Sequence, residues 1–289
     1  MGGLAYQEEA KDIVDYQLFQ LEGSSEWFRG PAFDLIDGEY ITFIGAAQVF
    51  GTFCRYPFTH MIAERLPRQI LNLGIGGAGP RRFLQDPVLM EGIGRGALTV
   101  IQVMSGRSAE NSEYEALEGN SLIRRKGSEA PFQYAELVWR SLIAERPERE
   151  VRRLIDETRE DWLAHMIELC RRIPTPKVLL WISHRRPEAY PDTLEGEVKA
   201  TMEVFPHFVD RALIDRLVPH VDRYVEAVTS RRSPQLLSNR RTGLPYTVQR
   251  DTGSFSWQMG YPSPEMHEDV ANALFPVLWE MLPKPWERG

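Results

Sequence analysis

The stretch ITFIGAAQVFG, residues 41–51, decides the fold. Its first four residues form a short apolar-rich run that is typical of a buried strand. The small residues Gly45, Ala46 and Ala47 then make a sharp turn, and a helical pattern begins after Gly51. A strand, a tight turn and a helix in this order are typical of the start of an open α/β sheet, whose ligands bind beyond the strand ends. We therefore expect this turn to form part of a ligand site.

Four more apolar runs follow and alternate with helical patterns. They cover residues 69–73, 98–104, 177–182 and 224–228, and together with residues 40–44 they predict five strands. Such alternation predicts a mostly parallel sheet with helices on both faces. The expected fold class is α/β, a three-layer α/β/α sandwich around a five-stranded, mostly parallel sheet.

The remaining segments are assigned around this sheet. Residues 1–289 are expected to form a single α/β domain, with an N-terminal arm at 1–38 and a helical insertion at about 115–160. Residues 264–281 carry the pattern of a last helix, with apolar positions on one face. The polar, Pro- and Gly-rich stretch 230–262 is predicted to be a long loop, and loops of that length in compact domains are usually functional or disordered.

Composition excludes several classes of protein. The net charge of -7 argues against general nucleic-acid binding, which needs a basic face. The sequence has no run of 18 apolar residues, so no membrane span is expected. The acidic N-terminus lacks the apolar core of a signal peptide, and we expect a cytoplasmic protein. Cys54 and Cys170 give neither a disulfide framework nor a metal-ligand spacing, and no metal ligands are predicted.

Arginine is strongly preferred over lysine, because 29 of the 34 basic residues are arginine. One explanation is a GC-rich genome, and the other is a set of planar forks that bind phosphate, sulfate or carboxylate groups. Four of the five predicted strands are followed by arginines. These are Arg81 and Arg82, Arg107, Arg185 and Arg186, and Arg231 and Arg232. An anion site at this edge is one prediction, with Arg107 as its best single residue, and pairing with solvent or neighbouring carboxylates is the alternative.

The order of the motifs resembles that of the SGNH (GDSL-like) hydrolase superfamily. That family carries a Gly-Asp-Ser turn after strand one, a glycine after strand two, a Gly-x-Asn-Asp element after strand three and an Asp-x-x-His element before the last helix. The corresponding places hold Gly45-Ala46-Ala47, Gly74-Ile75-Gly76-Gly77, Gly106-Arg107-Ser108 and Pro264-Glu265-Met266-His267.

The chain departs from the family at the triad. Ala47 stands in the place of the nucleophilic serine and Pro264 in the place of the acid, so only His267 of the triad is present. A methyl group cannot attack a carbonyl, and the acyl-serine mechanism is therefore not expected at this turn. The turn that ends in Gln48 also weakly resembles the Gly-Asn-Cys-Gln turn of capsule-polysaccharide acyltransferases that bind coenzyme A.

The resemblance and the residue types together predict a site. His267 is the expected general base, since an imidazole titrates near neutral pH, and Gln48 is expected to offer an amide to a ligand oxygen. A helix-capping or surface role is the alternative for His267. The expected ligand-binding residues lie at the carboxyl ends of the strands. They are Gly45, Ala46, Ala47, Gly76, Gly77, Arg107, Asn111, His184, Arg185 and Arg186.

Three functions are compatible with these residues. The first is sulfo or acyl transfer from an activated anionic donor, a phosphoadenosine-type nucleotide or coenzyme A, to a hydroxyl-bearing, carbohydrate-type acceptor. The second is an esterase with a displaced nucleophile, for which Ser105, Ser108, Ser112 and Thr52 are candidates. The third is a non-catalytic module that binds a small anionic molecule.

Overall fold

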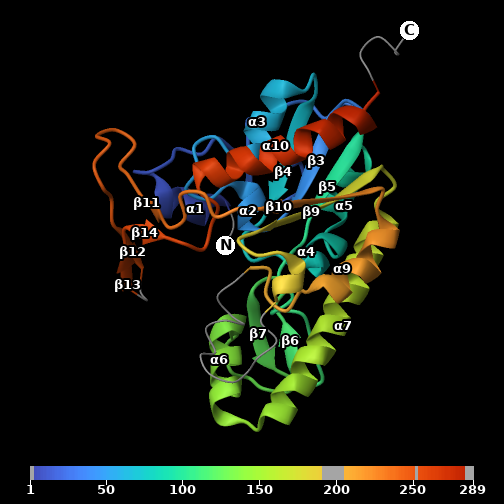
Figure 1. The fold of residues 1–289 in the computed structure, drawn as a ribbon, viewed down its shortest axis with the longest axis vertical. Helices are drawn as coiled ribbons and strands as arrows, with labels where there is room; N and C mark the ends of the chain where they lie inside the picture. Colours follow the sequence, from blue (N-terminus) through green and yellow to red (C-terminus); the bar gives the residue numbers. More distant parts are fainter. Residues whose placement is uncertain (1–2, 191–204, 251–252, 284–289) are drawn as a thin grey trace.

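The computed structural model describes residues 3–190, 205–250 and 253–283. A central sheet with the strand order β1-β2-β4-β3-β5-β9-β10 runs through the molecule, with helices packed on both of its faces (Figure 1). The predicted α/β class, the mostly parallel sheet and the three-layer arrangement are confirmed.

Five parallel strands make the body of this sheet. They are β3 (Tyr40–Gly45), β4 (Gln69–Gly74), β5 (Leu98–Gln102), β9 (Lys177–Ser183) and β10 (Arg223–Val228). The two short strands β1 (Leu18–Phe19) and β2 (Phe28–Arg29) add an antiparallel edge beside β4, which the sequence did not predict. From β3 the chain passes to β4, which lies on one side of β3, and then to β5, which lies on the other side of β3. Ligands of such sheets bind where the strand order reverses, beyond β3 and β5.

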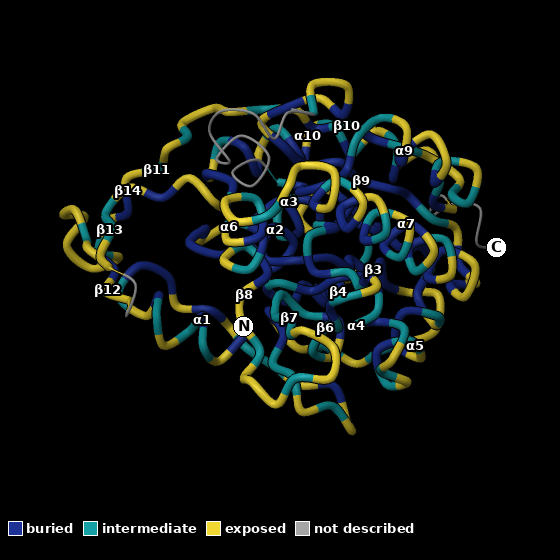
Figure 2. The backbone as a smooth tube through the Cα atoms, turned by 90° about the horizontal axis from the view of Figure 1, so that it is seen from below, coloured by how far each residue is buried: buried dark blue, intermediate teal, exposed yellow. Residues whose placement is uncertain are grey.

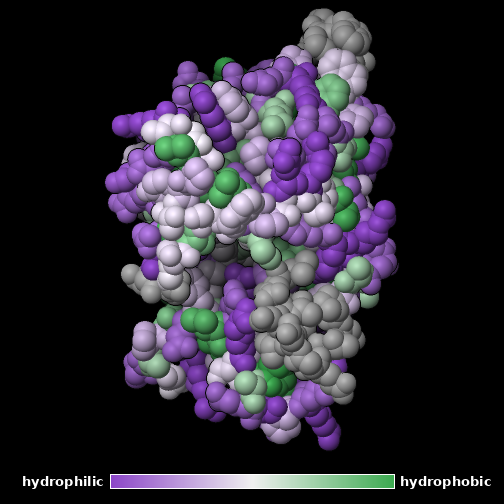
Figure 3. Space-filling view, turned by 60° about the vertical axis from the view of Figure 1, so that its left-hand side comes forward, coloured by the Kyte–Doolittle hydropathy of each residue, from purple (hydrophilic) through white to green (hydrophobic). Residues whose placement is uncertain are grey.

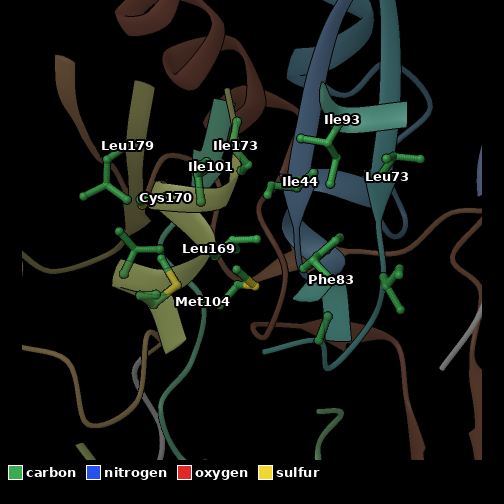
Figure 4. Close-up of a cluster of buried hydrophobic side chains, with 14 of the residues drawn as sticks. Ile44, Leu73, Phe83, Ile93, Ile101, Met104, Leu169, Cys170, Ile173 and Leu179 are labelled. Carbon is green, nitrogen blue, oxygen red and sulfur yellow. The ribbon is translucent and has the colours of Figure 1, made fainter. Parts of the chain in front are cut away.

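Alternating side chains of the strands supply two cores. Ile41 and Phe43 point to one face, where α3 (Phe58–Arg65) and α10 (Pro264–Met281) cover them. Ile44 points to the other face, as do Leu73 and Ile101, and Figure 4 shows these three near Phe83 and Leu169. The helices over that face are α4 (Pro80–Leu84), α5 (Pro87–Gly94), α7 (Glu148–Arg172) and α9 (Arg211–Leu217). Figure 2 shows that the strands between the two layers are buried.

The insertion between β5 and β9 differs from the expected purely helical segment. It contains a three-stranded antiparallel sheet of β6 (Tyr114–Ala116), β7 (Leu122–Arg125) and β8 (Gln133–Tyr134), followed by α6 (Ala135–Glu145) and the start of α7. Trp139, Leu154 and Ile123 form its own small core. The insertion makes the lower part of the molecule in Figure 1, and Figure 3 shows a hollow in the surface where it meets the sheet.

The stretch 230–262, expected to be a loop, contains two short antiparallel pairs. They are β11 (Gln235–Leu236) with β14 (Trp257–Gln258), and β12 (Val248–Arg250) with β13 (Gly253–Phe255). This stretch lies beside α1 (Gly3–Ala10) and α2 (Ala47–Phe50) at one side of the sheet (Figure 1). Two short 3-10 turns, Pro187–Ala189 and Val218–His220, flank α9 and complete the described elements.

Candidate functional site

The turn at the end of β3 is held by a neighbouring strand. The backbone N–H of Ala46 donates to the side-chain oxygen of Gln102 at 2.8 Å, and the Gln102 amide donates to the side-chain oxygen of Gln48 at 3.2 Å. Gly45 has φ +156, and a Cβ there would collide with Gln102. Gln48 is therefore a buried partner of Gln102 in this structure, and its amide oxygen is already engaged.

The space in front of Ala46 and Ala47, where we expected a ligand, is filled by the protein. Both residues are 5% exposed. Ala47 belongs to an aromatic cluster with Tyr6, Phe50 and Phe53, which come from α1 and from the turn itself. Side chains of the protein close this space, so Ala46 and Ala47, which we expected to bind a ligand, are packed in the interior.

His267 lies in the core and not at an open cleft. Its imidazole has no exposed surface and stacks on the Phe58 ring with centroids 5.7 Å apart. Its Nδ1 accepts a hydrogen bond from the Phe58 backbone N–H at 3.3 Å, and its Nε2 has no hydrogen-bond partner among the described residues. Burial, aided by the positive charge of Arg29, lowers the pKa of His267 to about 3. A neutral imidazole closed off from solvent cannot exchange protons with a substrate.

Most of the arginines that follow the parallel strands are paired with carboxylates. Such pairing was the alternative to an anion site in the sequence analysis. Arg82 pairs with Glu26 at 3.2 Å, and Arg231 pairs with Glu268 at 2.6 Å. Arg81 forms an ion pair with Glu110.

Arg185 has an internal role that the sequence did not suggest. It is 8% exposed, and its guanidinium donates to the carbonyl oxygens of Pro206 and Val209, each at 2.7 Å. Burial lowers the pKa of Arg185 to about 10. Arg185 therefore holds the segment 205–209 in place, whereas His184 and Arg186 are exposed.

Three further positions that we predicted to bind a ligand lie in turns that are packed by the protein itself. Asn111 donates to the Thr158 hydroxyl at 2.9 Å and accepts from the backbone N–H of Tyr114 at 2.8 Å, so its side chain closes a turn. Gly77 has φ +79 and packs against Ser121 of the insertion, which leaves no room for a side chain. Gly76 is buried beside it in the same turn.

The constellation with reactive chemistry lies after β5. Ser105 Oγ is 2.9 Å from His207 Nδ1, and the Arg107 guanidinium is 2.8 Å from the same nitrogen and 3.1 Å from Nε2. The backbone is joined as well, because the Gly106 N–H donates to the His207 carbonyl oxygen at 2.9 Å. Burial lowers the pKa of Arg107, the predicted best anion ligand, which here contacts a histidine. A serine in contact with an imidazole is the arrangement of a nucleophile and its base.

The backbone around this pair is tightly constrained. Phe208, directly after His207, has φ +65, which is unusual for a bulky residue, and it is fully buried against the Trp139 ring. A Cβ at Gly106 would lie 3.3 Å from the His207 carbonyl oxygen. Strained residues of this kind persist where the surrounding structure fixes them, and they cluster at functional sites.

Ser105 lines a small cavity of about 10 Å³ between the β5 turn, α4 and α7. Trp162, on its wall, is fully buried, and its indole N–H has no acceptor among the described residues. Asp161 and His165 stand one helical turn apart on α7, with Asp161 Oδ2 3.4 Å from His165 Nδ1. The complete wall consists of Gly79, Pro80, Arg81, Ser105, Ser108, Ala109, Gly119, Asp161, Trp162 and His165.

Sequence reasoning named Ser105 only as one of four displaced nucleophiles, and it missed His207. The sequence feature that points to Ser105 is its position directly after the third parallel strand. His207 follows the fourth strand, and the carboxyl ends of neighbouring parallel strands meet at one edge. No short motif joins two residues that are 102 positions apart.

The described part of the chain holds no group of three or more His, Cys, Asp or Glu side chains arranged to bind a metal ion. It also contains no helix whose length and apolar character would let it cross a bilayer.

Comparison with protein families gives one match. The model of a domain of unknown function, DUF6473, matches residues 4–117 and 130–282. The chain belongs to the DUF6473 family. No curated protein matches this DUF6473 chain.

Several solved structures are similar to the DUF6473 chain at low identity. A lipase, Lip_vut3 from a goat rumen metagenome, is 10% identical, with a TM-score of 0.44 over 82% of this chain and 96% of the lipase. The acetylxylan esterase Axe2 from Geobacillus stearothermophilus is 12% identical, with a TM-score of 0.40 over 89% of this chain and 100% of Axe2. LAE5, an alpha/beta hydrolase from the metagenome of Lake Arreo, is 14% identical, with a TM-score of 0.41 over 86% and 98%.

Proposed function

We propose that this protein is a serine esterase in which Ser105 is the nucleophile and His207 its general base. The observation that carries the proposal is the 2.9 Å contact between Ser105 Oγ and His207 Nδ1 at the edge of the sheet where such folds bind ligands. This assignment corresponds to the second function expected from the sequence, an esterase with a displaced nucleophile.

The chemistry follows from the contacts of the pair. With its proton on Nε2, His207 accepts the Ser105 hydroxyl proton on Nδ1 while Oγ attacks the ester carbonyl carbon. The Arg107 guanidinium lies against the same imidazole. The tetrahedral intermediate needs N–H donors for its oxygen. Candidate donors are the Arg107 backbone N–H, 3.5 Å from Ser105 Oγ, and the Trp162 indole N–H, which has no acceptor among the described residues.

The other predicted functions are weaker. His267 is closed off in the core and Gln48 is engaged by Gln102, so neither is retained as a catalytic group. Sulfo transfer from a phosphoadenosine donor, or acyl transfer from coenzyme A, would need free cations at the strand ends, and Arg81, Arg82 and Arg231 are paired with carboxylates. A small anionic molecule or a carbohydrate-type acceptor stays a prediction from the sequence.

Labelling with a fluorophosphonate probe tests the assignment, because the probe reacts covalently with activated serines. We expect one labelled residue, Ser105, located by peptide mass spectrometry. The Ser105→Ala variant should lose the label, and Ser141→Ala, which removes a helix-surface serine bonded to Glu145, should keep it. A label on Ser112 would assign the nucleophile there, and an unlabelled wild-type protein would favour the non-catalytic binding module.

A further inference from the structure

A second histidine faces the cavity onto which Ser105 opens. His165 lies on α7, and its Nδ1 is 2.8 Å from the Asp161 backbone oxygen and 3.4 Å from the Asp161 carboxylate. An Nδ1–H that donates to a carbonyl oxygen leaves Nε2 as the nitrogen that exchanges a proton. His165 is partly exposed, and both it and Ser105 line the cavity.

The charges around His165 are set by three side chains. Asp161 comes from its own helix, Arg81 from α4, and Glu110 from the segment after β5. The Asp161 carboxylate is fixed, because its Oδ2 accepts the backbone N–H of Glu110 at 3.0 Å. Arg81 is partly offset by its ion pair with Glu110. Hydrogen bonding to Asp161 raises the pKa of His165, against smaller opposing effects of burial and of Arg81.

The two histidines near Ser105 therefore have opposite surroundings. His207 has the cation Arg107 against its ring, whereas His165 has the anion Asp161. The carboxylate favours a protonated His165, which is the form that can give a proton to a leaving group.

We propose that His165 is the proton donor to the leaving alcohol, working across the cavity from the Ser105–His207 pair. This inference rests on the proposed esterase function and adds a second proton-transfer residue to it. In the first step Ser105 Oγ bonds to the carbonyl carbon and His207 takes the hydroxyl proton. The carbon–alkoxy bond then breaks, and the alkoxide takes a proton from His165, which becomes neutral.

The second half of the reaction restores both histidines. A water molecule attacks the acyl carbon and gives its proton to neutral His165. The bond from the acyl carbon to Ser105 Oγ breaks, and Oγ takes back the proton held by His207. The carboxylic acid leaves, and the balance is one ester and one water consumed for one acid and one alcohol. The cavity has room for about one water-sized group, which suits a place that the alcohol oxygen leaves and a water enters.

Comparing two acetate esters tests this role, because a proton donor matters only for a basic leaving group. Ethyl acetate releases a strongly basic alkoxide, and 4-nitrophenyl acetate releases a stable phenolate. For His165→Gln we expect ethyl acetate hydrolysis to fall about 100-fold. The 4-nitrophenol burst should stay within about threefold of wild type, with a slower steady state as acetyl-enzyme accumulates. His220→Gln, in the 3-10 turn that follows α9 and outside the cavity wall, is the matched control.

Two more measurements separate this inference from the proposed function. The rate of fluorophosphonate labelling of Ser105 should not change in His165→Gln, which also shows that the variant folds. In Asp161→Asn the basic limb of the pH–rate profile should move to lower pH, because the carboxylate that stabilises the imidazolium is lost. If the variants label normally and the acylation step slows equally for both esters, or for neither, the His165 role is overturned alone. If the wild-type protein is not labelled, the esterase function and the His165 role both fall.

Discussion

The imidazole of His267 is a titratable group enclosed by the core. Its pKa is lowered to about 3 because burial penalises the charged ring. An unfolded chain exposes the same ring, which then titrates near 6.5. Between these values the unfolded state binds more protons than the folded state, so stability is fully present above pH 6.5 and falls as the pH drops toward 3.

This linkage predicts an acid-sensitive fold. Between pH 6.5 and pH 5 the burial of neutral His267 should remove about 2 kcal/mol from the free energy of unfolding. Urea denaturation at several pH values measures this change. In a His267→Met variant the free energy of unfolding should fall by about 2 kcal/mol less between the two pH values. If the free energy of unfolding depended on pH in the variant as it does in the wild type, His267 would be protonated, or reached by water, in the folded protein.

The buried tryptophans allow a second test at the level of single residues. The Trp181 indole N–H donates to the Arg185 carbonyl oxygen at 2.9 Å, whereas the Trp162 indole N–H has no acceptor among the described residues. Changing either residue to Phe removes similar volume, but only Trp181→Phe also leaves a carbonyl unpaired.

We therefore expect Trp181→Phe to destabilise the protein by about 1 kcal/mol more than Trp162→Phe, the usual net contribution of a hydrogen bond. Chemical denaturation of the two variants decides this. Equal destabilisation would indicate that the Trp162 N–H is satisfied in solution, by water or by protein.

The segment 205–209 is the element on which the proposed site depends. It has little regular structure, and it is fixed by hydrogen bonds to neighbouring strand ends. Arg185 holds the Pro206 and Val209 carbonyl oxygens, and the Ser183 hydroxyl donates to the Phe205 carbonyl oxygen at 2.6 Å. The end of β9 thereby sets the position of His207 relative to Ser105.

Replacing Arg185 with lysine should disturb this element. One guanidinium nitrogen donates to both carbonyls while the guanidinium carbon lies 5.0 Å from the centroid of the Trp181 ring, an arrangement that a lysine ammonium does not reproduce. We expect fluorophosphonate labelling of Ser105 in Arg185→Lys to slow about tenfold or more. Arg216→Lys, at an exposed position paired with Glu160, should label like the wild type. Normal labelling in Arg185→Lys would show that His207 is held by other contacts.

At the same scale, the sequence predicted the strands of the central sheet much better than the insertion. Four of the five parallel strands, β3, β4, β5 and β9, are largely buried on both faces and read as apolar runs, and the last helix matches residues 264–281. The strands β6, β7 and β8 are two to four residues long and mostly polar. Such short polar strands carry no periodic signal, so only tertiary pairing reveals them.

Charge pairing is a property of the whole molecule. The arginine-rich edge looked like an anion site in the sequence because each arginine was considered without its partners. The partners are remote in sequence: Arg82 meets Glu26, and Arg240 meets Asp15 at 3.1 Å. The same remoteness hid the contact between Ser105 and His207, since a single sequence does not show which segments meet after folding.

These pairs predict a weak response to anionic ligands. A phosphoadenosine nucleotide, coenzyme A or sulfate at about 1 mM should raise the melting temperature by less than about 1 °C, because binding stabilises a fold only as the ligand concentration exceeds its dissociation constant. Differential scanning fluorimetry measures the shift. A rise of several degrees with one of these ligands would restore the anion-site hypothesis.

The parallel arrangement of β3 and β5 has a consequence for how such proteins change over time. Both strands end at one edge and their cores do not depend on which of them carries a reactive side chain. In this chain the first end carries Ala47, packed under aromatic rings, and the third carries Ser105 in contact with an imidazole. Because neighbouring parallel strands end at one edge, the same scaffold offers more than one position for a reactive side chain.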